Sequence, residues 1–396
     1  TRYTRVTGVQ TCALPILHYP MDLVLLYTHL KQATILKTHK SMKNLILTVI
    51  AVCSLNTIQA QEISYKKWVK EAPRLEDSFF TTPKAKEVAE TVLLYQQPTG
   101  GWPKNINFFQ TPDNKEKALE IKNDVNASTI DNGATTTEII YLSRLYNATH
   151  DETYKEAAIR GLDYLFEAQY ENGGWPQFYP RPKGYYVQIT YNDNAMINVM
   201  NLLRDVSNGK SLFTYLPEST RQKAKKAIDK GVECILKTQV KQHGKLTVWC
   251  AQHDRETFAP AKARAYELPS LSGAESANIV IYLMQLPNPS AEVIQSIESA
   301  VKWFKDSEIK GIKIESFINK DGKKDRRVAP CEDCKPMWAR FYELETNRPF
   351  FCDRDGIKRY HLSEIGYERR NGYSWLNRSG ENVYKEYAQW QKRIRK

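Results

Sequence analysis

A four-residue run, Gly-Gly-Trp-Pro, occurs twice in this chain and constrains its fold more than any other feature. It stands at 100–103 and again at 173–176, and each copy follows a predicted helix that ends in glutamine. A weaker third copy leads from Gln239 to Trp249, so the three tryptophans are 73 and 74 positions apart (102 to 175, and 175 to 249). Two helices with their loops fill about that length. The spacing therefore indicates a repeated helix pair, which stacks into a solenoid or closes into an α/α toroid.

Apolar residues recur at helical spacing along most of the chain. The expected helices are one that begins at Thr82-Pro83 and others near 134–148, 151–169, 192–208, 219–239, 272–285 and 290–306. Strand patterns are short and sparse. We therefore predict a mainly α protein.

The first sixty residues are set apart from the fold. Met42-Lys43-Asn44, the apolar run 45–55 and Gln59-Ala60 are typical of a signal peptide over 42–60. We predict secretion or periplasmic export, with residues 1–41 as an upstream or non-native extension. Residues 61–396 form the predicted folded domain, in which 305–396 are a candidate C-terminal subdomain. No apolar run reaches the roughly 18 residues that a transmembrane helix needs.

The net charge limits the classes of binding partner, and the cysteine count limits the possible disulfides. With 57 Lys+Arg against 45 Asp+Glu, the formal net charge is +12, and 23 Tyr and 8 Trp suit a groove for a polar polymer. Export favours an acidic polysaccharide over nucleic acid. Five cysteines follow residue 60, so at least one lacks an intramolecular partner. Cys331 and Cys334 form a single C-x-x-C, for which a local disulfide is at least as good an interpretation as a metal site.

Carboxylates stand at the starts of three equivalent helices. Asp131-Asn132, Asn192-Asp193 and Glu275 each precede an apolar-periodic segment. Aspartate is also a preferred helix N-cap, which is the plainer interpretation of any one of them. Because helices of one set in an alternating array start at the same end, we expect Asp131, Asp193 and Glu275 to converge. Carboxylate and amide oxygens together favour Ca²⁺. These residues supply too few ligands for a closed site, so we expect an anionic substrate to complete the coordination shell.

Cationic and aromatic residues gather downstream. They are Lys262, Arg264 and Tyr266, then Arg340 with its aromatic neighbours, and then Arg354. Arginine binds carboxylates through a bidentate fork. A solvated basic face is the plainer alternative for each residue alone, and the cluster as a whole favours anion binding.

Six ordered motifs resemble polysaccharide lyase family 10, the pectate lyases. They are Gly100-Gly101-Trp102-Pro103-Lys104-Asn105, Thr129-Ile130-Asp131-Asn132-Gly133-Ala134-Thr135, Asn172-Gly173-Gly174-Trp175-Pro176-Gln177, Tyr191-Asn192-Asp193, Ala263-Arg264-Ala265-Tyr266-Glu267-Leu268-Pro269 and Trp338-Ala339-Arg340-Phe341-Tyr342. The resemblance covers roughly residues 65–392. The Cys331–Cys334 stretch departs from it.

The resemblance implies an α/α toroid-like fold, an incomplete α/α barrel whose long loops form an open groove. It implies Ca²⁺-dependent β-elimination of α-1,4-linked polygalacturonate (pectate), which gives 4,5-unsaturated oligogalacturonides. Asp131, Asp193 and Asn132 would be the metal residues, and Arg264 would be the base that removes the C5 proton. Arg340 and Arg354 would bind uronate carboxylates, and we add Lys262, Tyr266 and Trp175 as candidate substrate-binding residues. We expect a monomer that binds no nucleic acid.

Arginine is a difficult base because its pKa lies above about 12. Arg264 is therefore essential in this hypothesis either as the base or as a charge stabiliser, and Arg255 is the second candidate. Two other functions fit the same fold, a glycoside hydrolase for acidic glycans and a non-catalytic module that binds acidic polysaccharide. A hydrolase would need a carboxylic acid of raised pKa as proton donor, for which Asp131, Asp193 or Glu275 could serve.

Overall fold

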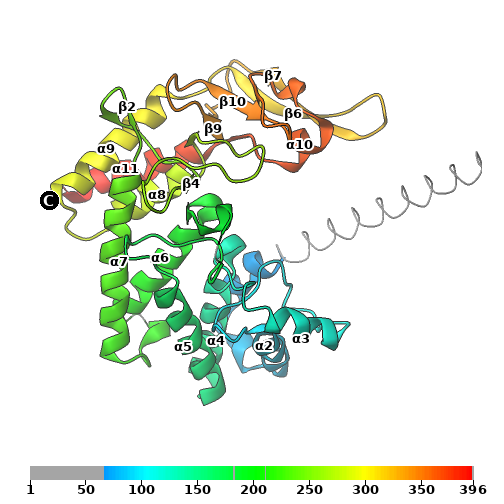
Figure 1. The fold of residues 1–396 in the computed structure, drawn as a ribbon, viewed down its shortest axis with the longest axis vertical. Helices are drawn as coiled ribbons and strands as arrows, with labels where there is room; N and C mark the ends of the chain where they lie inside the picture. The colour runs from blue at the N-terminus through cyan, green and yellow to red at the C-terminus, as the bar shows by residue number, and fades with distance from the viewer. Residues whose placement is uncertain (1–66, 182, 210, 395–396) are drawn as a thin grey trace, which may run out of the picture. The chain divides into compact units, whose positions relative to one another are not determined.

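Helices make up most of the regular structure in the part of the chain that the computed structural model describes, residues 67–394 except 182 and 210 (Figure 1). The α-helices are α2 (Pro83–Tyr95), α3 (Lys115–Asn123), α4 (Thr136–Thr149), α5 (Glu152–Glu167), α6 (Ala195–Ser207), α7 (Glu218–Thr238), α8 (Glu275–Met284), α9 (Ala291–Asp306), α10 (Tyr367–Gly372) and α11 (Ser379–Ile394). Short 3₁₀ turns are η1 (Ala72–Arg74), η2 (Asp77–Thr81), η3 (Asp131–Gly133), η4 (Tyr185–Val187), η5 (Asn192–Asn194), η6 (Ser211–Phe213) and η7 (Leu362–Glu364).

The helices pack in successive pairs. α4 packs on α5, α6 on α7 and α8 on α9. The first members, α4, α6 and α8, contact one another in succession, and so do α5, α7 and α9 (Figure 1). The repeated helix pair that the tryptophan spacing predicts is therefore present. Closure of the two rows into a toroid-like barrel stays a prediction.

Each repeat tryptophan caps the C-terminal end of the preceding helix. The indole Nε1 donates to a carbonyl oxygen near the C-terminal end of that helix, where carbonyls lack intrahelical partners. The three bonds are Trp102 to Val92 at 2.8 Å, Trp175 to Leu165 at 2.8 Å and Trp249 to Ile235 at 2.7 Å. All three tryptophans are 0% exposed. The repeated tryptophans are therefore part of the hydrophobic core.

The repeat glutamines join neighbouring pairs. Each side-chain Nε2 donates to one loop carbonyl and to one carbonyl of the next helix in the row. The bonds are Gln96 to Gly100 and Ala157, Gln169 to Gly173 and Ala227, and Gln239 to Thr247 and Ser296. The 73- and 74-residue spacing thus reflects the same glutamine-mediated contact between neighbouring helix pairs, which occurs three times.

Short strands connect the later helices. They are β1 (Ile189–Thr190), β2 (Lys241–Gln242), β3 (Lys245–Leu246), β4 (Gln252–His253), β5 (Leu271–Ser272), β6 (Ile312–Ile318), β7 (Lys324–Pro330), β8 (Trp338–Ala339), β9 (Phe341–Tyr342), β10 (Pro349–Cys352), β11 (Lys358–Arg359) and β12 (Leu376–Asn377). The largest sheet has the order β11-β10-β9-β5. β5 leads into α8, and Ser272 of β5 pairs with Phe341 of β9, which brings Arg340 beside the start of α8.

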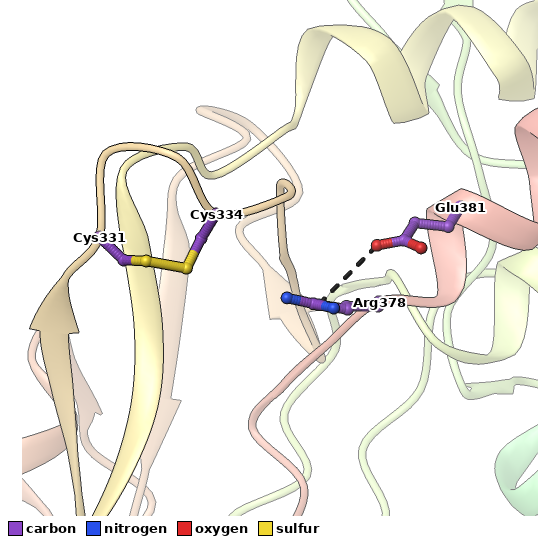
Figure 2. The surroundings of a disulfide bond; sticks show 4 residues. All are labelled: Cys331, Cys334, Arg378 and Glu381. Carbon is purple, nitrogen blue, oxygen red and sulfur yellow. Dashed lines mark ion pairs between the residues drawn. A yellow bond between two sulfur atoms is a disulfide. The ribbon is translucent and has the colours of Figure 1, made fainter.

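The hairpin β6–β7 departs from the expectation of only short strands. Its two seven-residue strands pair antiparallel from Ile312↔Pro330 to Ile318↔Lys324. Cys331 and Cys334 form a disulfide in the loop that follows β7, and Figure 2 shows it together with the Arg378–Glu381 ion pair near the start of α11. The local disulfide favoured from sequence is therefore present, and Cys234, Cys250 and Cys352 are free and buried.

The N-terminal predictions fall outside the described residues. These predictions are the extension over residues 1–41 and the signal peptide over residues 42–60. The described residues cluster as one compact unit, in which α11 packs against α8 and α9. In the described part of the chain, no helix combines the length and the apolar character needed to cross a bilayer.

Candidate active site

Asp131 lies at the end of a loop that leads into α4, almost wholly buried. Its Oδ2 accepts hydrogen bonds from Lys104 Nζ at 2.5 Å and from Gln177 Nε2 at 2.7 Å. Its Oδ1 is buried and has no hydrogen-bond partner among the described residues. A buried carboxylate oxygen without a donor is costly. This oxygen is therefore free for a ligand.

Asp193 lies in the matching turn before α6, at the position that Asn132 holds in the turn before α4. Its backbone has φ 52°, and Asn132, in the matching turn before α4, has φ 54°. This left-handed conformation is uncommon for residues other than glycine and often marks a functional site. Asn192 Nδ2 donates to Asp193 Oδ2 at 2.8 Å, and the Asp193 side chain is 41% exposed.

Neither aspartate caps a helix. The N-cap of α4 is Thr135 and that of α6 is Asn194, and neither makes a side-chain cap hydrogen bond. The plainer interpretation of Asp131 and Asp193 as N-caps is therefore wrong.

Arg340 joins the third acid to the second. Its Nη2 lies 2.8 Å from Glu275 Oε1 and 3.6 Å from Asp193 Oδ1, and it donates to Asn192 Oδ1 at 3.0 Å. The guanidinium also lies 4.4 Å from the centre of the Tyr373 ring. Arg340 is 8% exposed. The positive charge of Arg340 therefore offsets the repulsion between Glu275 and Asp193.

The charges of these groups act on one another. Desolvation raises the pKa of Asp193 above its ordinary value, and the charge of Arg340 opposes that rise. The negative charges of Asp131 and Glu275 raise the pKa further, and Arg264 lowers it. The turns η3 and η5 contact each other, and η5 contacts α8. The structure therefore brings Asp131, Asp193 and Glu275 together with two arginines, as the helix order predicts.

Arg264 is held by one carboxylate. Its Nε donates to Glu267 Oε2 at 2.8 Å and its Nη2 to Oε1 at 2.5 Å, and Tyr373 Oη donates to Oε1 at 2.9 Å. Burial opposes the charge of Arg264, but the bonds and charge of Glu267 outweigh it and raise the pKa of the guanidinium. The side chain is 44% exposed. Arg264 is thus a fixed cation with an open side.

Comparison with known proteins identifies the family of this chain. A model of the pectic acid lyase family matches residues 96–384. The chain belongs to the pectic acid lyase family. Among curated proteins no match was found.

The lyase is also similar to solved structures. One is a family 10 polysaccharide lyase from Cellvibrio cellulosa, with 36% identity, 82% of this chain and 94% of that chain covered, and a TM-score of 0.69. Another is a mutant of a family 10 polysaccharide lyase from the same organism in complex with trigalacturonic acid, with 36% identity, 82% and 95% covered, and a TM-score of 0.69. The resemblance found in the motifs is confirmed, and the protein is a polysaccharide lyase.

The remaining predicted residues lie in different surroundings. Trp175, expected to contact substrate, is buried in the core of the lyase and its indole N–H is already bonded, because the repeat uses it to close α5. Tyr266 is 5% exposed, with the guanidinium carbons of Arg264 and Arg369 at 5.1 and 4.4 Å from its ring centre. Trp175 and Tyr266 therefore do not present open rings to a polymer.

Arg354 and Lys262 are both exposed. The Arg354 side chain is 67% exposed and pairs with Glu368 at 3.3 Å. Its loop lies against that of Arg264, since a Cβ on Gly356 would be 3.3 Å from the Ala265 carbonyl oxygen. Lys262 is close enough to Cys352 for its charge to act on that thiol. Arg354 is therefore an exposed cation near Arg264 whose partner in this structure is Glu368.

Sequence reasoning missed four partners that define the site. Lys104, Gln177 and Glu267 stand inside the quoted motifs, so their presence there was the available signal. Tyr373 stands in none of them. Their roles depend on contacts with Asp131, Glu267 and Arg340, which spacing along the chain does not reveal.

The oxygen donors fit Ca²⁺ better than a softer metal. Among the described residues, no three or more His, Cys, Asp and Glu side chains cluster so that they could hold a metal ion by themselves. Asp193 and Asn132 do line a pocket of about 490 Å³, together with Asn194 and Asn198. Lys70 also lines this pocket. Asp131, whose Oδ1 has no partner among the described residues, directly precedes Asn132 in the chain. The oxygens of Asp131, Asn132 and Asp193 are hard ligands.

Proposed function

We propose that this lyase cleaves α-1,4-linked polygalacturonate by β-elimination and releases 4,5-unsaturated oligogalacturonides. The observation that carries the proposal is the meeting of Asp131, Asp193 and Arg264 in one mutually charged site. A similar lyase is solved in complex with trigalacturonic acid, which supports the same substrate class here.

The C5 proton of a galacturonate unit lies α to a carboxylate and is only weakly acidic. We propose that Arg264 removes this proton as a neutral guanidine. The electron pair of the C5–H bond forms the C4–C5 double bond, the C4–O4 bond breaks, and O4 takes a proton from water. Arg354 binds a uronate carboxylate and so fixes the sugar relative to Arg264. The buried Arg340, first expected to bind a uronate as well, instead holds Asp193 and Glu275 in place.

Asp131, Asp193 and Asn132 would hold Ca²⁺. Bound there, the ion would supply Lewis-acid stabilisation of charge on the substrate carboxylate. The unpartnered Oδ1 of Asp131 and the partly exposed carboxylate of Asp193 support this assignment. Because these residues supply few ligands, we expect affinity for the ion to rise when the substrate adds its own oxygens.

The pair with Glu267 favours the protonated form of Arg264. The base form therefore becomes available only as that pair weakens or as the pH rises. We expect activity to increase toward alkaline pH.

The test follows the ultraviolet absorbance of the conjugated double bond during incubation with polygalacturonate and Ca²⁺. We expect wild type to form this product and Arg264→Ala to lose activity by about a thousandfold or more. Arg255→Ala tests the second candidate in the same assay, and because the Arg255 side chain pairs with Glu256 at 3.6 Å and lies 5.6 Å from the centre of the Tyr170 ring, we expect this variant to keep most of the activity. Near-wild-type turnover by Arg264→Ala would overturn its assignment.

The same assay tests the metal and the alternatives. EGTA should abolish product formation, and Ca²⁺ but not Zn²⁺ should restore it. Full activity in EGTA would overturn the metal role of Asp131 and Asp193. New reducing ends without the ultraviolet signal would indicate a hydrolase, and binding without either signal would indicate a non-catalytic module.

A further inference from the structure

Three aromatic rings form a continuous row that starts beside the candidate site. The rings of Phe178 and Tyr186 have centres 5.2 Å apart, and those of Tyr186 and Tyr185 are 4.1 Å apart. Phe178 is buried, whereas Tyr185 and Tyr186 are partly exposed. The row therefore has a buried base and an accessible end.

Each end of the row meets a residue of the site. Lys104, which binds Asp131, lies 5.2 Å from the centre of the Phe178 ring. At the other end, the charges of Arg264 and Glu267 act on the hydroxyl of Tyr185. The row therefore starts beside Lys104, and Tyr185 at its other end lies within electrostatic reach of Arg264 and Glu267.

The guanidinium of Arg181 lies against two of the three rings. The guanidinium carbon of Arg181 lies 4.5 Å from the centre of the Phe178 ring and 4.8 Å from that of Tyr186. Arg181 is held there by a bond from its Nε to the carbonyl oxygen of Asn126 at 2.9 Å. Stacking fixes the plane of a guanidinium, and its edge can then bind a carboxylate.

The backbone holds the two tyrosines in place. The carbonyl oxygen of Tyr186 accepts from the amides of Gln177 at 3.0 Å and Phe178 at 3.4 Å. Gly184, at φ 92°, starts the turn before them. A Cβ at Gly184 would lie 3.3 Å from Tyr186 Cδ2. The tyrosines therefore sit on an ordered turn.

We propose that Tyr185 and Tyr186, with Arg181 beside them, form a sugar-binding strip for galacturonate units next to the one that reacts. This inference rests on the proposed function and adds residues that the elimination itself does not use. A uronate ring has C–H faces that suit an aromatic surface and a carboxylate that suits Arg181. The strip therefore fits an acidic polysaccharide chain, and a longer chain gains more from it than a trimer.

The experiment compares Tyr185→Ala and Tyr186→Ala with Tyr185→Phe and Tyr186→Phe. We expect each alanine variant to raise KM for polygalacturonate about fivefold or more with kcat within about twofold, because binding is lost and chemistry is not. The phenylalanine variants keep the ring and should stay within about twofold in KM. Trigalacturonate should show a smaller change in KM than the polymer.

Tyr367→Ala is the matched control. This tyrosine is 40% exposed on α10, and its hydroxyl donates to the Lys324 carbonyl oxygen at 3.0 Å. It should leave both constants unchanged. If an alanine variant fails to fold, Tyr186→Leu keeps the bulk without the ring and should raise KM in the same way.

Binding is also measured without turnover. In an Arg264→Ala background with Ca²⁺, retardation in a gel that contains polygalacturonate should fall when either tyrosine becomes alanine or leucine. Unchanged KM and unchanged retardation would overturn the strip, and so would a fall in kcat at constant KM. Wild type that makes no unsaturated product would overturn the proposed elimination, while the gel still decides about the strip.

Discussion

Glu267 holds the guanidinium of Arg264 in a two-point pair, with Nε to Oε2 at 2.8 Å and Nη2 to Oε1 at 2.5 Å. The Glu267 side chain is only 4% exposed, whereas that of Arg264 is 44% exposed. The carboxylate is thus the buried support and the guanidinium is the part open to a ligand. This arrangement fixes the orientation of Arg264 and also stabilises its protonated form.

Glu267→Gln should shift the pH dependence of the lyase. If Arg264 accepts the C5 proton as a neutral guanidine, removing the charge of Glu267 lowers the pKa of Arg264, because the charged hydrogen bonds and the charge of Glu267 together outweigh burial. The rise of kcat/KM with pH should then move to lower pH by about one unit or more. Tyr373→Phe, which removes only the hydroxyl bonded to Glu267, should move it much less. An unmoved profile with a lower kcat would instead indicate a permanently charged Arg264.

Lys104→Met should tighten binding of Ca²⁺ to the free protein. Lys104 Nζ lies 2.5 Å from Asp131 Oδ2, so its charge repels a second cation at the same carboxylate. We expect the dissociation constant, measured by titration calorimetry without substrate, to fall about three- to tenfold. Asp131→Asn should weaken binding, and Lys84→Met, from an exposed helical pair with Glu87, is the control. Weaker binding by Lys104→Met would contradict the assignment of Asp131 as a ligand.

Glu138→Gln should remove a pH dependence of stability. Burial raises the pKa of Glu138 from 4.5 to about 7, although the bond from Trp68 Nε1 at 2.8 Å opposes the rise. The folded protein therefore holds this proton more tightly than the unfolded chain does. The free energy of unfolding should fall by about 3 kcal/mol as the pH rises from about 4.5 to 7, and stay level above that.

Urea unfolding at several pH values measures this effect. Relative to wild type, Glu138→Gln should gain stability across that interval, and the exposed Glu156→Gln should follow wild type. Parallel curves for Glu138→Gln and wild type would show that Glu138 does not carry the effect.

Gly173→Ala should destabilise the protein far more than Gly244→Ala. Both glycines have positive φ, 90° and 78°, but a Cβ at Gly173 would lie 2.0 Å from the Lys230 carbonyl oxygen, whereas Gly244 has no neighbour within 4 Å. We expect losses in the free energy of unfolding of more than about 3 kcal/mol and of about 1 kcal/mol, respectively. Equal losses would mean that backbone conformation alone explains the glycine in the repeat.

Much of the helical framework could be predicted from the sequence because its causes are local. α2 begins after Thr82, whose Oγ1 accepts from the Ala85 amide at 3.2 Å, as a Thr-Pro start indicates. The three indole hydrogen bonds to helix ends recur because the sequence repeats a similar turn three times. The motifs also identified the family, since they place Asp131, Asp193 and Arg264 in order along the chain.

Only the tertiary structure decided which of these side chains face a ligand. Trp175, inside the third motif, was a candidate substrate-binding residue, but its indole N–H binds the Leu165 carbonyl oxygen at the end of α5 and the ring is buried. Arg340 binds Asn192, 148 positions away, and Glu275. Such pairings depend on how the helix rows pack and on which charges burial forces together. The identities of the residues therefore specified the chemistry, and the packing specified which of them remain available to perform it.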